Sequence, residues 1–165
     1  MRAAESVREG SRMTGIESND SQNLVALVDE QLKLYKQLDA LSMRQHEFVE
    51  SEDTDGLLKV LGQRQELIKS ITDSATRMAP YRARWDDHVR ELKEPLRDRL
   101  RKGLDNLSAV MQAIAERDES DRVAMETRRD AVKGQLGGVK RGTAAVSAYG
   151  GTAQTRGPRY QDRKA

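Results

Sequence analysis

The chain has 165 residues, of which 34% are charged and only 4% aromatic, and its formal net charge is +2. A chain of this length has room for one modest domain, and so few large side chains argue against a wide core that could enclose an enzyme pocket. The absence of cysteine excludes disulfides and thiolate metal sites, and the composition favours amphipathic helices with one apolar stripe each.

The first 20 residues predict a disordered N-terminal extension. The opening "MRAAESVREGSRMTG" lacks the apolar core of a secretory signal. No apolar run approaches the roughly 20 residues that span a bilayer. These features predict a cytoplasmic protein that is not inserted in a membrane.

A first helix is predicted over residues 21–51, where apolar residues recur in alternating steps of three and four. Gln31 and Gln45 fill the two positions that this stripe lacks, and Asp20 or Ser21 can cap the helix start. The stripe comprises Leu24, Leu27, Leu34, Leu38, Leu41 and Phe48.

A second helix is predicted over residues 54–79, opened by Asp53 or Thr54. The connection to the first helix is short, so the two helices form an antiparallel hairpin. Pro80 does not fit a helix interior, and the following segment predicts an irregular or short helical corner. Pro95 suits the first turn of the next helix.

A third, long helix is predicted over residues 95–147. The charged run "ERDESDR" (116–122) interrupts its apolar stripe, but the stripe resumes in register, which favours one continuous helix. At about 1.5 Å per residue it is longer than the hairpin can cover. Its last third is therefore expected to overhang, with an exposed apolar stripe and the glycines Gly134, Gly137, Gly138 and Gly142.

The last stretch, residues 148–165, predicts a flexible basic tail. Tyr149 and Gly150 have the pattern of a helix end, since glycine is favoured just past a helix terminus. From residue 133 onward, seven basic residues stand against Asp162 alone. The predicted fold is thus all-α: an elongated antiparallel hairpin or three-helix bundle with a long third helix and flexible tails.

The residues offer little support for catalysis, metals or cofactors. His46 and Glu50 are four apart, but no third ligand appears at helical spacing, and His88 lies in a charged corner without a pocket. No glycine loop follows a strand. Nucleic-acid binding calls for a one-sided basic stripe with stacking aromatics, which only the short tail approaches. We therefore expect no enzyme activity, no cofactor and no nucleic-acid partner.

Three stretches resemble the FlgN family of flagellar export chaperones. The family's opening hairpin is similar to "LVDEQLKLYKQLDALSMRQHEFVESEDTDGLLKVLGQRQELIKSI", and its third helix to "LRKGLDNLSAVMQAIAERDESDRVAMETRRDAV". Its ending resembles "AYGGTAQTRGPRYQDRKA", with Tyr149, Gly150, Asp162 and Lys164 at the matching positions. The FliT-type chaperones, of similar size and shape, are a close alternative.

The resemblance implies a cytoplasmic chaperone for the hook–filament junction proteins FlgK and FlgL. Such a chaperone binds the C-terminal helical segments of these clients, prevents their premature assembly and aids their delivery to the flagellar type III export apparatus. The end of the third helix supplies a complementary stripe. The predicted client-binding residues are Val132, Leu136, Val139, Val146 and Tyr149, with Lys140 and Arg141 as charges at the rim.

Two alternatives use the same residues differently. Val132 and Leu136 could pack on the hairpin, which would make the stripe structural. The stripe could also join copies of the chain into a homo-oligomer, which would make the protein a coiled-coil adaptor or self-assembling scaffold.

Overall fold

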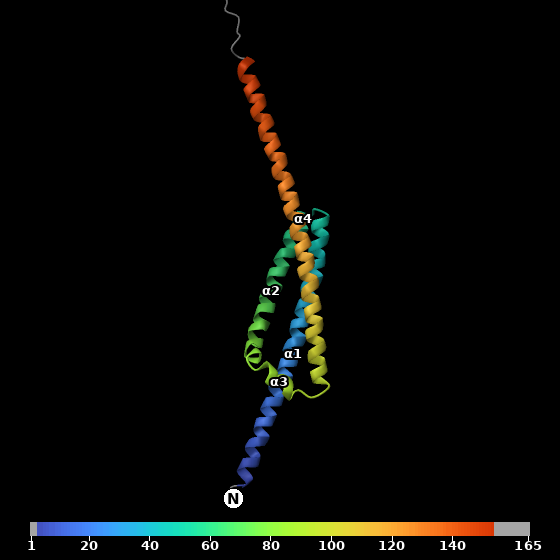
Figure 1. Cartoon of the computed structure of the whole chain (residues 1–165), viewed down its shortest axis with the longest axis vertical. Helices are drawn as coiled ribbons and strands as arrows, with labels where there is room; N and C mark the ends of the chain where they lie inside the picture. Colours follow the sequence, from blue (N-terminus) through green and yellow to red (C-terminus); the bar gives the residue numbers. More distant parts are fainter. Residues whose placement is uncertain (1–2, 154–165) are drawn as a thin grey trace, which may run out of the picture. The chain divides into compact units, whose positions relative to one another are not determined.

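A computed structural model describes the backbone of residues 3–153 and the side chains of residues 19–149. Within these ranges the chain is all-α, without a strand, which confirms the predicted fold class. The helices are α1 (Ala3–Glu50), α2 (Thr54–Arg82), α3 (Trp85–Glu91) and α4 (Leu96–Ala153) (Figure 1).

The first helix begins earlier than its apolar stripe predicts. The stripe starts at Leu24 and the sequence predicts disorder before residue 21, whereas the backbone is helical from Ala3. No proline occurs before Pro80, and residues 3–9 are mostly good helix formers such as alanine, glutamate and arginine. Ser21 consequently does not cap the helix; its hydroxyl donates to Glu91 at the end of α3, at 3.2 Å.

The turn between α1 and α2 follows the prediction closely. Asp53 is the N-cap of α2, and its carboxylate accepts a hydrogen bond from the backbone N–H of Gly56 at 2.9 Å. A Cβ atom at Gly56 would lie 2.6 Å from the ring of Phe48. This close approach explains a glycine in the first turn of a helix.

The corner after α2 contains a short helix, α3. The sequence predicts either an irregular or a short helical corner here and does not decide between the two. Pro80 does not end α2 at once, because it lies in the last turn and the helix continues to Arg82. After α3, Pro95 immediately precedes α4 rather than occupying its first turn. The carbonyl of Pro95 accepts the N–H of Arg99 at 3.0 Å and so starts the hydrogen-bonding pattern of α4.

The long helix α4 runs through the charged interruption and past the predicted end. It includes Gly150 and ends at Ala153, so the helix terminus predicted at Tyr149–Gly150 is wrong. Glycine lowers helix stability by about 1 kcal/mol relative to alanine but still adopts helical dihedral angles. Residues 148–153 of the predicted basic tail belong to α4, and the rest of the tail, including Asp162 and Lys164, lies outside the described residues.

The chain divides after Asp121 into two units, residues 1–121 and residues 122–165. We call them the N-terminal unit and the C-terminal unit. α4 contributes its first part to the N-terminal unit and its second part to the C-terminal unit. The two units are described separately below.

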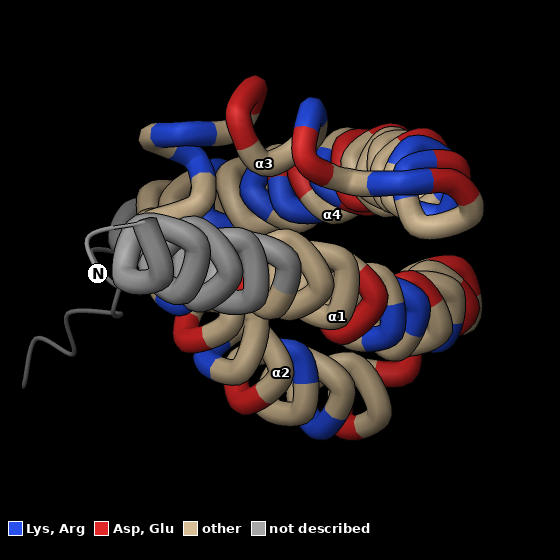
Figure 2. The backbone as a smooth tube through the Cα atoms, turned by 90° about the horizontal axis from the view of Figure 1, so that it is seen from below, with Lys and Arg blue, Asp and Glu red and all other residues tan. Residues whose placement is uncertain are grey.

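In the N-terminal unit, α1 lies between α2 and the first part of α4 (Figure 2). The backbone of α4 lies against the side chain of Val28 on α1 at Gly103, where an added Cβ atom would lie 3.2 Å from Val28 Cγ1. One cluster of buried side chains lies near the corner, and a second lies further along the hairpin. The cluster near the corner comprises Leu24, Val25, Val28, Met78, Leu92 and Leu100. The second cluster comprises Leu38, Ile71 and Ile114.

Both glutamines in the α1 stripe are buried, as their seam positions predict. Gln31 is 4% exposed and its amide donates to the backbone carbonyl of Ile71 on α2 at 3.2 Å. Gln45 is 5% exposed and donates to the carboxylate of Asp121 on α4 at 2.8 Å. A buried amide is tolerated in a helix seam when it is hydrogen-bonded, so these residues also fix the register of the hairpin.

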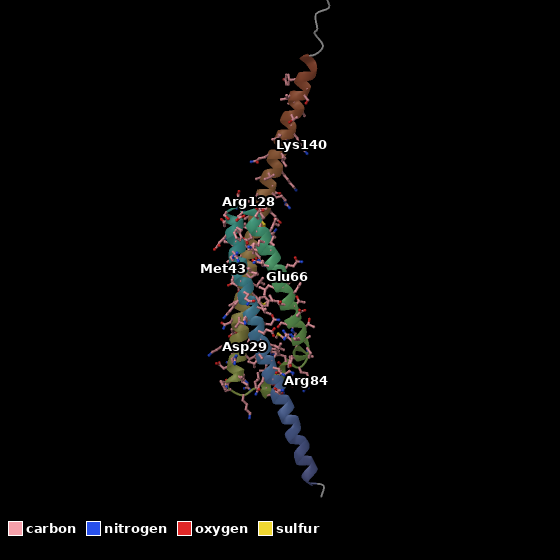
Figure 3. All side chains as sticks on the ribbon, turned by 180° about the vertical axis from the view of Figure 1, so that it is seen from behind. Asp29, Met43, Glu66, Arg84, Arg128 and Lys140 are labelled. Carbon is pink, nitrogen blue, oxygen red and sulfur yellow. The ribbon has the colours of Figure 1, made fainter. Side chains whose placement is uncertain are left out.

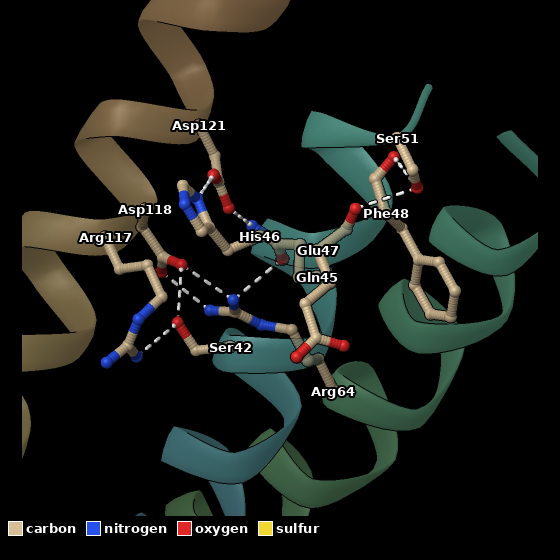
Figure 4. A network of polar contacts seen from close by, with 10 residues as sticks. All are labelled: Ser42, Gln45, His46, Glu47, Phe48, Ser51, Arg64, Arg117, Asp118 and Asp121. Carbon is tan, nitrogen blue, oxygen red and sulfur yellow. Dashed lines mark hydrogen bonds and ion pairs between the residues drawn. The ribbon is translucent and has the colours of Figure 1, made fainter. Parts of the chain in front are cut away.

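A polar cluster joins the three long helices at the end of the N-terminal unit (Figure 4). We call Gln45, His46, Arg64, Asp118 and Asp121 the polar clamp. Arg64 on α2 makes a bidentate pair with Asp118 on α4, with both N–O distances 2.7 Å, and also donates to Gln45 Oε1. The clamp thus connects α1, α2 and α4 through paired groups, of which Gln45 and Asp121 are buried and His46 and Asp118 are partly exposed.

The clamp gives a structural role to two polar features of the sequence. His46, whose pairing with Glu50 lacks a third metal ligand, has its Nδ1 atom 2.6 Å from Asp121. The run 116–122, read as an interruption of packing, supplies Asp118 and the buried Asp121 to the clamp, and its Arg117 pairs with Asp39 at 2.8 Å. Charged residues therefore replace apolar ones in this part of the α4 contact.

Candidate functional site

The largest row of exposed apolar side chains in the C-terminal unit follows one face of α4. We call Val132, Leu136, Val139, Val146 and Tyr149 the apolar stripe. Their exposed fractions rise from 52% at Val132 to 81% at Tyr149. Apolar side chains of this size are usually at least half covered in a folded protein, so a row of them identifies a candidate contact surface.

The spacing of the stripe is that of a coiled-coil seam. Residues 132, 136, 139, 143 and 146 alternate in steps of four and three, which keeps them on one helical face. Thr143 occupies the one polar position, and its hydroxyl donates to the carbonyl of Val139 at 3.0 Å. The hydroxyl is therefore hydrogen-bonded within its own helix and needs no partner across the seam. The surface therefore matches a partner helix better than a flat or extended partner.

Arg128 sets the N-terminal limit of the stripe. At about 100° per residue, it lies on the same face as Val132 and Val139, one turn before the stripe begins. Further toward the N-terminal unit, Val123 and Met125 are also exposed, at 49% and 38%. The uninterrupted apolar row therefore begins at Val132.

The basic residues near the stripe do not share one position around the helix. At about 100° per residue, Lys140 lies beside the stripe, about 40° beyond Leu136. Arg141 lies about 180° around the helix from Val132 and about 140° from Val146. The guanidinium of Arg141 extends toward Gly137, where a Cβ atom would be 3.9 Å from it. Lys140, whose side chain is labelled in Figure 3, thus lies at the rim, and Arg141 lies on the far face.

The sequence reasoning missed Lys133, which lies seven residues before Lys140 and on the same edge of the helix. Both lysines are exposed. The seven-residue spacing was the signal that could have identified Lys133. We call Lys133 and Lys140 the basic edge of the stripe.

Three glycines make this part of α4 sterically open and intrinsically weak. A Cβ atom at Gly134, Gly138 or Gly142 would meet no other atom within 4 Å. Each glycine lowers the stability of the helix by about 1 kcal/mol relative to alanine. A bound partner therefore increases the helical population of residues 132–149 more than it would increase that of an alanine-rich helix.

Other kinds of site find little support in the described part of the chain. No group of three or more histidine, aspartate or glutamate side chains that could hold a metal ion occurs there. No helix in that part is both long and apolar enough to cross a membrane. A smaller exposed apolar set, Leu58, Leu61 and Ile68, lies on α2, but it lacks an accompanying row of like charges.

Comparison with known proteins gives one family. The family model described as FlgN protein matches residues 13–157, which is most of the chain and includes the apolar stripe, the basic edge and the polar clamp. Neither the curated proteins nor the solved structures gave a match.

Proposed function

The chain belongs to the FlgN family, and we propose that it is a cytoplasmic, non-enzymatic chaperone that holds hook-associated proteins for flagellar export. The apolar stripe on α4 is the proposed binding surface. Its clients in this proposal are the hook–filament junction proteins of the FlgK and FlgL type, bound through their C-terminal helical segments.

The observation that carries the proposal is the exposure of five apolar side chains, four of them at seam spacing, within the region that the family model matches. A helix that is fully covered within its own protein would bury such a row. Removing one valine or leucine side chain from water contributes about 1.5–3 kcal/mol. Covering the stripe therefore supplies a favourable free energy that opposes the cost of ordering both partners.

The mechanism follows from what an assembly-competent helix presents to solvent. Clients that assemble through amphipathic helices expose apolar faces before they reach the growing structure, and such faces associate prematurely. A chaperone helix with a complementary stripe covers the same face by helix-to-helix packing. Delivery to the export apparatus then requires release of the client from the stripe, which a non-covalent contact of this size permits.

A binding experiment with the complete chain tests this function. We expect the protein, mixed with a hook-associated protein from the same flagellar system, to form a discrete complex in size-exclusion chromatography with light scattering. We also expect it to suppress polymerisation of that client. A hook-associated protein that neither joins a complex nor polymerises more slowly would contradict the proposal.

The same instrument separates the alternative function. A self-assembling scaffold would show a molar mass that grows with concentration in the absence of any client, because the stripe of one copy would cover that of another. The chaperone is expected to remain a species of constant mass over the micromolar range and to change mass only when the client is added.

A further inference from the structure

The charge around the apolar stripe is one-sided. From Val132 to Tyr149 the sequence contains Lys133, Lys140 and Arg141 and no acidic residue. The basic edge lies beside Leu136, whereas the opposite edge of the stripe carries small uncharged residues such as Ala131, Gly138 and Gly142. A partner helix lying on the stripe therefore meets positive charge along one edge only.

The lysines of the basic edge differ from other basic residues of α4 in their surroundings. Arg122 pairs with Glu126 at 2.7 Å, and Arg129 lies 3.3 Å from the carboxylate of Asp130. For Lys133 and Lys140 the described residues provide no carboxylate within ion-pair distance, and both side chains are exposed. Unlike Arg122 and Arg129, these lysines can therefore pair with a partner without first breaking an ion pair seen within the helix.

We propose that the partner of the stripe is an amphipathic helix with aspartate or glutamate along one edge of its apolar face, opposite Lys133 and Lys140. This inference rests on the proposed function and specifies the chemistry of the client segment. Charges that flank a helical seam set the choice and orientation of the partner helix. The single basic edge therefore selects among apolar helices and fixes which way round the client lies.

Two other occupants of the stripe fit the charge pattern less well. A second copy of this chain would bring the same basic edge and no acid in the matching segment, and like charges across a seam oppose pairing. An anionic membrane surface is best matched by a helix with basic residues flanking its apolar face on both sides. Here the second edge is small and uncharged.

A pair of adjacent substitutions provides a matched test. Lys140→Glu and Arg141→Glu make the same change in net charge at neighbouring exposed positions, one at the basic edge and one on the far face. With a hook-associated protein of the same flagellar system as the probe, we expect Lys133→Glu combined with Lys140→Glu to weaken binding about 10-fold. Arg141→Glu is expected to weaken it less than about 2-fold, in line with a screened charge away from the contact.

Salt dependence and circular dichroism complete the measurement. Binding by the unaltered chain is expected to weaken as salt rises, and binding by the double lysine variant is expected to lose most of that dependence. Equal losses for Lys140→Glu and Arg141→Glu at unchanged helicity would overturn the inference. So would tighter client binding by the double lysine variant.

The outcomes also distinguish this inference from the proposed function. If the lysine variants bind the client normally while polar substitutions in the stripe abolish binding, the function stands and the acidic edge is wrong. If neither set has an effect, the stripe is not the client site. A parallel titration with phosphatidylserine vesicles would overturn the acidic helix if the lysine substitutions removed vesicle binding and left client binding unchanged.

Discussion

Replacing Leu136 and Val139 together by aspartate is expected to weaken binding of the hook-associated client by at least about 100-fold. Each substitution removes an apolar side chain worth about 1.5–3 kcal/mol on burial and also places a charge against the client's apolar face, which resists desolvation. Two such changes in the centre of the stripe exceed the roughly 2.7 kcal/mol that a 100-fold loss represents. Isothermal titration calorimetry with the purified client measures the effect.

The matched control places the same two charges on the opposite side of the same helix. Ala145 and Ala148 are exposed and lie at least about 120° around the helix from Leu136 and Val139, so Ala145→Asp and Ala148→Asp form the control pair. They are expected to leave client affinity within about 3-fold of the unaltered chain. If the control pair reduced binding as much as the stripe pair, the effect would come from a weakened helix rather than from lost contacts.

Replacing Asp121 by alanine is expected to lower the free energy of unfolding by about 2–4 kcal/mol. The carboxylate is 1% exposed and lies within hydrogen-bond distance of both Gln45 and His46, at 2.8 and 2.6 Å. Its removal leaves the buried amide of Gln45 without this acceptor. Urea unfolding followed by circular dichroism measures the loss.

Two further variants isolate the hydrogen bonds of Asp121 from its volume and charge. Asp121→Asn keeps the shape, and its amide oxygen can still accept from Gln45 while its NH₂ donates to a neutral His46, so we expect it to lose less than half as much stability as Asp121→Ala. Asp105→Ala, at an exposed carboxylate on the same helix, is expected to change stability little. If Asp121→Ala were as stable as Asp105→Ala, the polar clamp would not hold α4 to the hairpin.

The helices of the hairpin could be predicted from sequence because their apolar spacing is local information. Steps of three and four residues identify α1 and α2, and the Asp53 cap identifies the start of α2. The end of α2 near Pro80 was harder to predict, because a proline weakens a helix but need not end it within the same turn. The start of α1 at Ala3 was missed because its first turns carry no apolar periodicity.

The polar clamp could not be predicted because it depends on contacts between residues far apart in the chain. Arg64 and Asp118 are 54 residues apart, and His46 and Asp121 are 75 apart. A charged run on a helix has the same local pattern whether it faces water or a complementary charge. Only the alignment of three helices decides which of these occurs.

More of the candidate site than of the polar clamp could be predicted from the sequence, because an exposed helical seam depends on local spacing and not on contacts between distant residues. Val132, Leu136, Val139 and Val146 follow from heptad spacing alone, whereas Tyr149, three residues after Val146, does not. The structure places all five residues of the apolar stripe at the surface. Arg141 was assigned to the rim by its neighbourhood in sequence, although a helix turns about 100° per residue. Its position on the far face gives its predicted role in binding no geometric support, which is why Arg141→Glu serves as the control for Lys140→Glu.

The division of α4 at Asp121 gives one helix two roles. Its first part closes the N-terminal unit through apolar contacts and the polar clamp, and its second part carries the proposed binding stripe. Stability and the proposed binding are thus expected to depend on different residues. Substitutions in the clamp are expected to alter unfolding, and substitutions in the stripe are expected to alter client affinity.

Hydrogen exchange of the complete chain with and without its hook-associated client tests the central claim most directly. The glycine-weakened residues 132–149 are expected to exchange rapidly alone and to gain at least about 10-fold protection when the client covers the stripe, because helix opening must then compete with binding. Amides around the polar clamp are expected to change little. Client-induced protection confined to Leu58, Leu61 and Ile68 on α2, with none in residues 132–149, would contradict the account.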